Sequence, residues 1–226
     1  MIYAIADLHL DSSGEKPMDI FGENWIGHDK KIFDSWNKNI KEDDLVLLPG
    51  DISWGLKLED ARRDLEIIDS LPGTKIITKG NHDYWWSSMS KLNGLELKKT
   101  IFLNNTSYEY NGIGICGTRG WMDKSSSEYK SDMESIYLRE MGRLRNSIES
   151  SKAERKIVLL HYPPFDGNKN LNDFGKIALE YKAEVLLYGH LHGEGHREVV
   201  EGNFDGMEVI CVSSDFINFE VKKIWD

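Results

Sequence analysis

Short apolar runs that alternate with amphipathic patterns constrain the fold of this chain more than any other feature. Residues 1–6, 45–49 and 75–78 have the length and composition of buried β-strands. Between them, residues 27–40 and 58–71 carry apolar side chains at helical spacing. This order of strands and helices predicts parallel strands joined by helices that cover the sheet.

The rest of the chain repeats this alternation and adds hairpins. Residues 106–110 and 113–117 are joined by Asn111-Gly112, a dipeptide typical of tight β-hairpins. Residues 124–130, which contain three consecutive serines, are predicted to form a loop. Further strands are expected at residues 101–103, 156–160, 185–188, 197–200, 207–212 and 218–224, and further helices at 131–151 and 172–182. We therefore predict an α/β fold of two packed mixed β-sheets flanked by helices, forming a single domain over residues 1–226.

Composition and charge narrow the range of partners. Hydrophobic residues make up 40% of the 226 residues, which is enough for a sizeable core. The formal net charge is −10, and no Lys/Arg cluster forms the basic stripe that holds long nucleic acids. A small phosphorylated substrate is compatible with this charge, because bound divalent cations would offset it locally.

The chain shows no signal for a membrane or an oxidising compartment. No stretch approaches the roughly 18 apolar residues of a membrane span, and residues 1–7 lack the features of a signal peptide. Cys116 and Cys211 lie far apart in apolar runs, which indicates buried free thiols. We expect a soluble, cytoplasmic protein without a membrane partner. The sequence does not fix its oligomeric state.

Polar side chains that can bind metal follow almost every predicted strand. These residues are Asp7, His9, Asp51, Asn81, His82, Asp83, His161, His190 and His192. Five of the seven histidines of the chain lie in these loops. Since the carboxyl ends of parallel strands share one edge of a sheet, we expect these side chains to converge there.

Taken one at a time, several of these motifs have ordinary structural explanations. Asp7 is compatible with a loop cap beside a surface His9, Asp51 with an Asx-turn, and His161 with a core histidine. The segments 80–83 (Gly-Asn-His-Asp) and 189–193 (Gly-His-Leu-His-Gly) are more specific, because turn-compatible polar residues concentrate there.

Together, the ordered motifs D-x-H, GD, GNHD, H and GHxH over residues 7–192 resemble those of the calcineurin-like metallophosphoesterase superfamily. This resemblance implies a two-metal site in which Asp51 bridges both ions. One ion would be bound by Asp7, His9 and His192, and the other by Asn81, His161 and His190. Oxygen and imidazole ligands together suit Mn, Fe, Zn or Co better than Mg or Ca.

Two such ions, about 3.5–4 Å apart, can clamp the oxygens of an in-line displacement at phosphorus and supply hydroxide at neutral pH. By the resemblance, His82 would act as general acid or stabilise the transition state. No such role is assigned to Asp83. Purple acid phosphatases have an iron-binding tyrosine three residues after the GD aspartate. Trp54 occupies that position here, so a ferric-tyrosinate site is not expected.

A few residues outside these motifs keep two interpretations. Arg119 follows a predicted strand and is a candidate for binding a substrate phosphate, with a structural salt bridge as the alternative. His196 follows the last motif closely enough to approach the site, whereas His28 is expected to be a surface histidine. Trp54 and the Trp85-Trp86 pair can stack on an aromatic substrate or pack beneath the loops.

The sequence therefore predicts a metal-dependent hydrolase of a phosphomonoester or phosphodiester whose substrate is a small phosphorylated molecule. Two other hypotheses are a non-catalytic metal-binding scaffold and a nuclease on short oligonucleotides. A scaffold would be expected to lack metal ligands or His82, and none is replaced here. The acidic charge argues against the nuclease.

Overall fold

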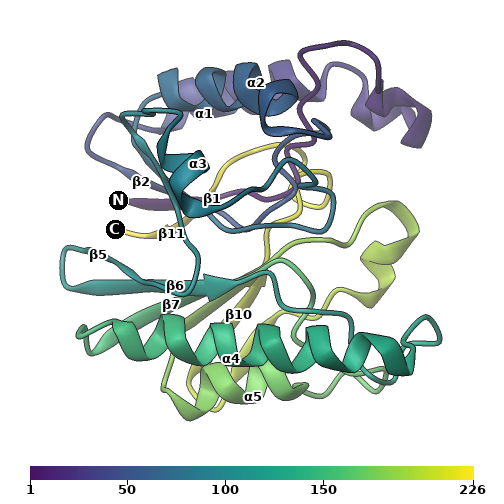
Figure 1. The fold of residues 1–226 in the computed structure, drawn as a ribbon, viewed down its shortest axis with the longest axis vertical. Coiled ribbons are helices and arrows are strands. Elements are labelled where there is room, and N and C mark those ends of the chain that lie inside the picture. The colour runs from purple at the N-terminus through teal and green to yellow at the C-terminus, as the bar shows by residue number, and fades with distance from the viewer.

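The computed structural model describes residues 1–226 as two β-sheets packed face to face between two layers of helices (Figure 1). The first sheet contains β1 (Ile2–Ala4), β2 (Leu45–Leu48), β3 (Thr74–Ile77), β4 (Thr100–Phe102) and β11 (Lys222–Trp225). The second contains β5 (Tyr108–Tyr110), β6 (Ile113–Thr118), β7 (Arg155–Leu160), β8 (Val185–Tyr188), β9 (Gly202–Phe204) and β10 (Met207–Cys211). The α-helices are α1 (His28–Asn39), α2 (Leu58–Ser70), α3 (Met89–Asn93), α4 (Glu134–Ser150) and α5 (Asp173–Glu180). The predicted α/β fold of two mixed sheets is confirmed.

Both sheets are parallel in the middle and antiparallel at an edge. The strand order is β11-β1-β2-β3-β4 in the first sheet and β5-β6-β7-β8-β10-β9 in the second, with β11, β5 and β9 antiparallel to their neighbours. Beyond their ends the two sheets meet, because Ala6 forms a parallel bridge with Ser213. The carboxyl ends of the parallel strands of both sheets therefore lie at the same end of the molecule, opposite the two termini in Figure 1.

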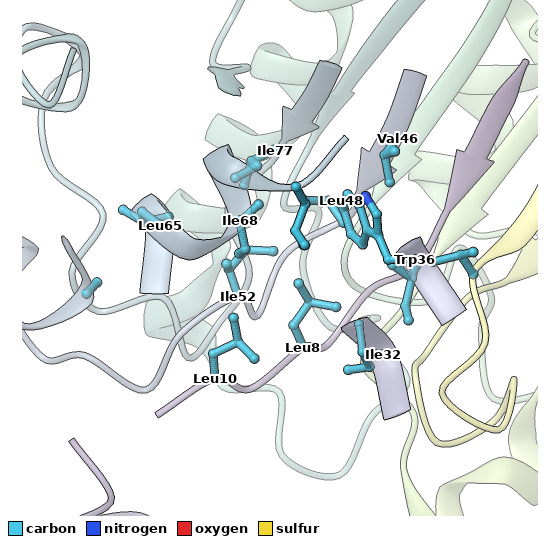
Figure 2. Close-up of a cluster of buried hydrophobic side chains, with 14 of the residues drawn as sticks. Leu8, Leu10, Ile32, Trp36, Val46, Leu48, Ile52, Leu65, Ile68 and Ile77 are labelled. Atoms are coloured by element: carbon cyan, nitrogen blue, oxygen red, sulfur yellow. The ribbon is translucent and has the colours of Figure 1, made fainter. Parts of the chain in front are cut away.

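Three apolar layers hold these elements together. Strand β2 shows how the layers arise, since its successive side chains point to opposite faces of the sheet. Val46 and Leu48 pack under α1 and α2 with Trp36 (Figure 2), whereas Leu45 and Leu47 pack between the two sheets. The third layer lies between the second sheet and α4 and α5. Each buried leucine of this kind contributes about 1.5–3 kcal/mol relative to an exposed one.

The strand predicted at residues 197–200 is wrong. A 3₁₀ helix, Gly193–Glu198, occupies its first half, and the side-chain hydroxyl of Tyr188 pairs with the backbone of Val200. A side chain thus satisfies backbone groups that a neighbouring strand would otherwise have bound. The antiparallel edge strand is instead β9, which forms a hairpin with β10.

Other boundaries differ in smaller ways. The last strand begins at Lys222 and not at residue 218, because Asn218 and Phe219 have left-handed backbone angles (φ 55° and 60°) that end a strand. The predicted hairpin is confirmed, with Asn111 and Gly112 both at positive φ (49° and 79°). The first three residues of the helix predicted at 131–151 form a 3₁₀ turn, Ser131–Met133, and residues 124–130 contain no helix or strand.

Three short elements were not predicted from the sequence, because they lack a hydrophobic period. They are α3 and the 3₁₀ helices Met18–Phe21 and Glu23–Trp25. Cys116 and Cys211 are buried and unpaired, as expected. No helix combines the length and the apolar character needed to cross a bilayer.

Candidate metal centre

The side chains predicted to bind metal gather where the carboxyl ends of the two sheets meet. Asp7, His9 and His192 each offer a ligand atom within 4.8 Å of the others, and so do Asp7, Asp51 and His161. A third group lies beside them. Asn81 Oδ1 is 2.6 Å from His161 Nε2 and 2.8 Å from His190 Nδ1. The structure therefore brings together all seven residues from five separate loops.

Each of the two buried carboxylates has one oxygen fixed and the other left for a ligand. Asp7 Oδ2 accepts a hydrogen bond from the backbone nitrogen of His190 (2.9 Å), while its Oδ1 is buried with no hydrogen-bond partner. Asp51 Oδ1 accepts one from the backbone nitrogen of His82 (2.8 Å). Asp51 Oδ2 lies 3.4 Å from His161 Nε2 and 3.9 Å from His9 Nε2. A buried oxygen without a partner costs free energy unless a cation or donor binds it.

The imidazole rings also fit a metal site. His9 Nε2 lies 3.4 Å from His192 Nε2, and His161 Nε2 lies 3.3 Å from His190 Nδ1. Nitrogens that face each other this closely cannot both carry a proton, so at least one lone pair of each pair points inward. Imidazole nitrogens beside carboxylate oxygens are the donor set that divalent transition metals prefer. The residues present therefore fit bound divalent ions.

The loops that carry these side chains have a strained backbone. Asp7, His9, Asp51 and His190 all have left-handed backbone angles, with φ of 60°, 45°, 54° and 77°. Such angles are uncommon for residues with a Cβ and cost on the order of 1–3 kcal/mol each. Four of the seven candidate ligands adopt them, which indicates that the loops are shaped for side-chain placement and not for stability.

Two glycines allow the loops to approach each other. A Cβ on Gly80 would lie 2.1 Å from Asp51 Oδ1, and one on Gly189 would lie 2.5 Å from Asp7 Oδ2. Neither contact is possible for any other residue type without displacing a carboxylate. The glycines that precede Asn81 and His190 in the motifs therefore have a steric function.

Buried charge in the centre supports the same conclusion. Burial raises the pKa of Asp51 well above its usual range, and the neighbouring Asp83 and Asp7 carboxylates raise it further. For Asp7, burial also opposes ionisation, but His192 and other nearby histidines lower its pKa below the usual range. Burial, followed by the proximity of other histidines, lowers the pKa of His190 to about 3. Cations bound among these groups would offset the carboxylate repulsion.

Asp83 does not face the centre but binds the backbone of the loops around it. Its Oδ2 accepts hydrogen bonds from the backbone nitrogens of Asp51 (2.9 Å) and Gly80 (2.7 Å). Its Oδ1 accepts from the backbone nitrogen of Ile52 and from the Trp85 indole. Asp83 is fully buried, so these charge-assisted bonds join the loop that carries Asp51 to the loop that carries Asn81.

Asp215 is a site residue that the sequence analysis missed. Its Oδ1 lies 2.7 Å from His192 Nδ1, which leaves His192 Nε2 directed at His9 and Asp7. Its Oδ2 lies 3.1 Å from His196 Nε2, so His196 approaches the centre only through Asp215. The signal was present, because Asp215 follows β10 as the other candidates follow their strands.

His28 also differs from expectation. It is half-buried, and its Nε2 lies 3.1 Å from the backbone oxygen of Leu8 and 3.3 Å from that of His9. The expected surface histidine therefore supports the loop that carries Asp7 and His9. Since His28 is the first residue of α1, the packing of this helix affects the shape of the loop that carries Asp7 and His9.

His82 lies beside the centre without joining either group of candidate ligands. Burial and nearby His161 lower its pKa, and its Nδ1 is buried without a hydrogen-bond partner. Trp54 packs against it, with ring centroids 4.7 Å apart, and also stacks on His9 at 4.8 Å. Trp85 belongs to the core, as one of the two interpretations predicts.

Arg119 lies outside this group and lines a separate polar pocket with Lys79 and Arg143. Its guanidinium is 3.3 Å from Glu140 Oε1 and stacks on Trp121 at 4.3 Å. The structural salt bridge is therefore present. Arg119 Nε is buried without a partner, and the pocket has three basic side chains and one acidic one.

The arrangement of the fold and the centre corresponds to a known family. A family model of calcineurin-like phosphoesterases matches residues 1–194, and the chain belongs to this family. Both Asp/His groups lie within the matched residues.

More specific similarities are distant. A probable cyclic nucleotide phosphodiesterase of Coxiella burnetii is 20% identical over 161 residues, which are 67% of this chain and 61% of that protein. Two solved structures share the fold. A protein of unknown function from Aquifex aeolicus has a TM-score of 0.50 at 19% identity, covering 98% of this chain and 94% of its own. The phosphopantetheinyl hydrolase of Mycobacterium tuberculosis has a TM-score of 0.54 at 14% identity, covering 94% and 89%.

Proposed function

We propose that this protein hydrolyses a phosphomonoester or phosphodiester of a small molecule with two bound divalent transition-metal ions. One observation supports this more than any other. Asp7 and Asp51 each have one oxygen held by a backbone N–H and the other turned toward imidazole nitrogens. Ordinary structural carboxylates have no need for such an arrangement.

The proposed ligands divide into two sets that share one carboxylate. Asp7, His9 and His192 would hold one ion, and Asn81, His161 and His190 the other. Asp51 would bridge them, because its Oδ2 is within 4 Å of both His9 Nε2 and His161 Nε2. The mixed oxygen and nitrogen donors favour Mn, Fe, Zn or Co.

When bound, such ions polarise phosphoryl oxygens and lower the pKa of water, so that a nucleophile is available near neutral pH. The oxygen of water then bonds to phosphorus while the ester P–O bond breaks. His82, protonated by a proton taken from the attacking water, would donate a proton to the departing oxygen, which leaves as an alcohol. A positioned general acid of this kind contributes roughly 10²–10⁴-fold to the rate.

The substrate is proposed to be small, since the net charge of −10 disfavours a long nucleic acid. We also propose that Arg119 helps to bind a substrate phosphate. Burial and nearby Arg119 lower the pKa of Lys79, and an anion in their pocket would relieve this repulsion. Replacement of Arg119 by Gln should reduce kcat/KM for the phosphoester substrate. Replacement of Arg145, an exposed residue paired with Glu180, is the matched control.

The decisive experiment compares hydrolysis of a chromogenic phosphodiester with its monoester. The protein would be stripped with a chelator and reloaded with Mn²⁺, Fe²⁺, Co²⁺ or Zn²⁺, beside an Asp51→Asn variant. Turnover that requires metal and is lost in the variant supports the proposal. Cyclic nucleotides belong among the diesters because of the name of the Coxiella relative.

Binding of metal by the folded protein without any turnover would favour the non-catalytic scaffold. Cleavage restricted to short oligonucleotides would favour the nuclease. Metal content by elemental analysis separates these outcomes from a failure to load the site.

A further inference from the structure

A pocket of about 530 Å³ opens beside the candidate metal centre. Three of its lining residues, His9, His82 and His192, belong to the centre or adjoin it. The other walls are apolar and come mainly from Met18, Phe21, Trp25 and Trp54. No lysine, arginine, aspartate or glutamate lines this pocket.

The apolar wall is fixed in place by contacts with the centre itself. Trp25 is buried, and its ring packs edge-on against His9 and His192 with centroids 5.9 Å and 5.5 Å apart. The indole nitrogen of Trp54 lies 3.0 Å from Met18 Sδ. The wall is therefore formed before any ligand binds, which reduces the entropy lost on binding.

Exposed apolar side chains are concentrated around the same loops. Six large hydrophobic residues of the chain are exposed, and five lie in segments that adjoin the pocket. These are Ile20, Phe21, Ile26, Leu56 and Tyr84. The sixth, Leu138, is on α4. Exposed apolar groups do not stabilise the fold, and when they cluster at a concave site they mark a binding surface.

His82 indicates which part of the substrate enters this pocket. Its ring packs against those of Trp54 and Tyr84, with centroid distances of 4.7 Å and 6.1 Å. In the proposed function His82 protonates the departing oxygen, so the organic group on that oxygen extends from His82. The pocket that His82 lines is where this group would lie.

We infer that the pocket binds the leaving group of the substrate, and that this group is bulky, uncharged and apolar. This inference rests on the proposed hydrolysis at the same centre. The lining offers large apolar contact area and no lysine, arginine or carboxylate side chain, so sugar or peptide leaving groups with charges would lose hydration without an ion-pair partner. Phe21, at 62% exposure, would cover the bound group from the solvent side.

Binding and turnover can be tested separately. Non-hydrolysable benzylphosphonate, hexylphosphonate and methylphosphonate would be titrated into the Mn²⁺-loaded protein by calorimetry. The inference requires the two bulky ligands to bind at least about tenfold more tightly than methylphosphonate. The Phe21→Ala variant should reduce this ratio at least about fivefold, whereas the Leu138→Ala control, an equally exposed apolar residue, should leave it unchanged. Comparison of the affinities for benzylphosphonate and hexylphosphonate shows whether the pocket prefers an aromatic or an aliphatic group.

Hydrolysis of benzyl and methyl phosphate esters provides the second readout, because their leaving alcohols are of similar acidity. A ratio near one in both binding and kcat/KM would overturn the inference while leaving the proposed function intact. Preferential binding without hydrolysis of any ester would support the pocket assignment and contradict the proposed function.

Discussion

The Asp83 carboxylate binds the backbone of Asp51, because its Oδ2 accepts a hydrogen bond from the Asp51 backbone nitrogen at 2.9 Å. The Asp51 side chain therefore remains free to face the imidazoles, while Asp83 fixes the backbone of the loop that carries Asp51. The same oxygen accepts from Gly80 at 2.7 Å. One side chain that touches no candidate ligand atom therefore sets the relative position of two loops that carry candidate metal ligands.

Replacement of Asp83 by Asn should weaken both folding and metal binding. The amide has one acceptor oxygen where the carboxylate has two, so buried N–H groups would lose their partner. We expect the free energy of unfolding to fall by roughly 2–4 kcal/mol, and the affinity for Mn²⁺ to fall with it. Chemical denaturation and calorimetric titration measure the two effects. The Asp132→Asn variant, at an exposed position, is the control. Unchanged metal affinity would show that Asp83 is not needed to position the loops.

Gly80 and Gly142 allow the effect of an added methyl group to be compared at a crowded and at an open position. A Cβ on Gly80 would lie 2.1 Å from Asp51 Oδ1, whereas one on Gly142 in α4 would meet nothing within 4 Å. Gly80→Ala should therefore displace Asp51 and abolish tight metal binding. Gly142→Ala should stabilise the protein by about 0.5–1 kcal/mol, because alanine favours a helix interior. Full metal binding by the Gly80 variant would contradict the role given to this close contact.

Replacement of His82 should reduce turnover without reducing metal binding. Since it lies outside both groups of candidate ligands, His82→Gln is expected to keep the metal content of the parent protein. Its kcat should fall by roughly 10²–10⁴-fold for esters of weakly acidic alcohols. Esters with good leaving groups need less protonation and should lose less activity. Loss of metal in parallel with activity would instead identify His82 as a ligand.

Asp215 should control metal affinity through His192. Its carboxylate lies 2.7 Å from His192 Nδ1 and fixes the ring orientation. Removal of such a partner typically lowers metal affinity 10–100-fold, so we expect this loss for Asp215→Asn. Competition with a chelator of known affinity measures it. The same Asp132→Asn variant serves as the control, and an affinity within twofold of the parent would rule out this role.

Asp69 offers a test of acid stability away from the centre. Burial opposes its ionisation, but hydrogen bonds from the backbone nitrogens of Lys98 and Lys99 and from Thr100 lower its pKa. A carboxyl whose pKa is lower in the folded state stabilises the protein above its unfolded pKa, near 3.9, and loses this effect as pH falls through the folded pKa. The parent should therefore exceed Asp69→Asn in stability by about 0.5–1 kcal/mol at pH 7, because solvent screens this half-buried carboxylate. This difference should shrink below pH 4 in urea denaturation curves. A difference independent of pH would exclude Asp69 as the titrating group.

Local patterns in the sequence were sufficient for the strands and helices with a clear hydrophobic period. They failed where tertiary contacts replaced local pairing. Val200 has the composition of a strand residue, yet its backbone pairs with the Tyr188 hydroxyl. Phe219 has the same composition, but a left-handed backbone angle places it in a turn. These two differences depend on contacts with residues distant in sequence, so the local sequence does not indicate them.

Strand periodicity and ordered polar motifs are local properties of the chain, so the class of fold and the candidate ligands could be predicted from the sequence alone. Three features became evident only in the folded protein: which oxygen of Asp7 is free, that Asp215 supports His192, and that Phe21 borders the pocket beside His82. Each of these depends on distances between segments that are far apart in the chain. Those distances are set by the packing of two sheets and their helices, which no short motif encodes.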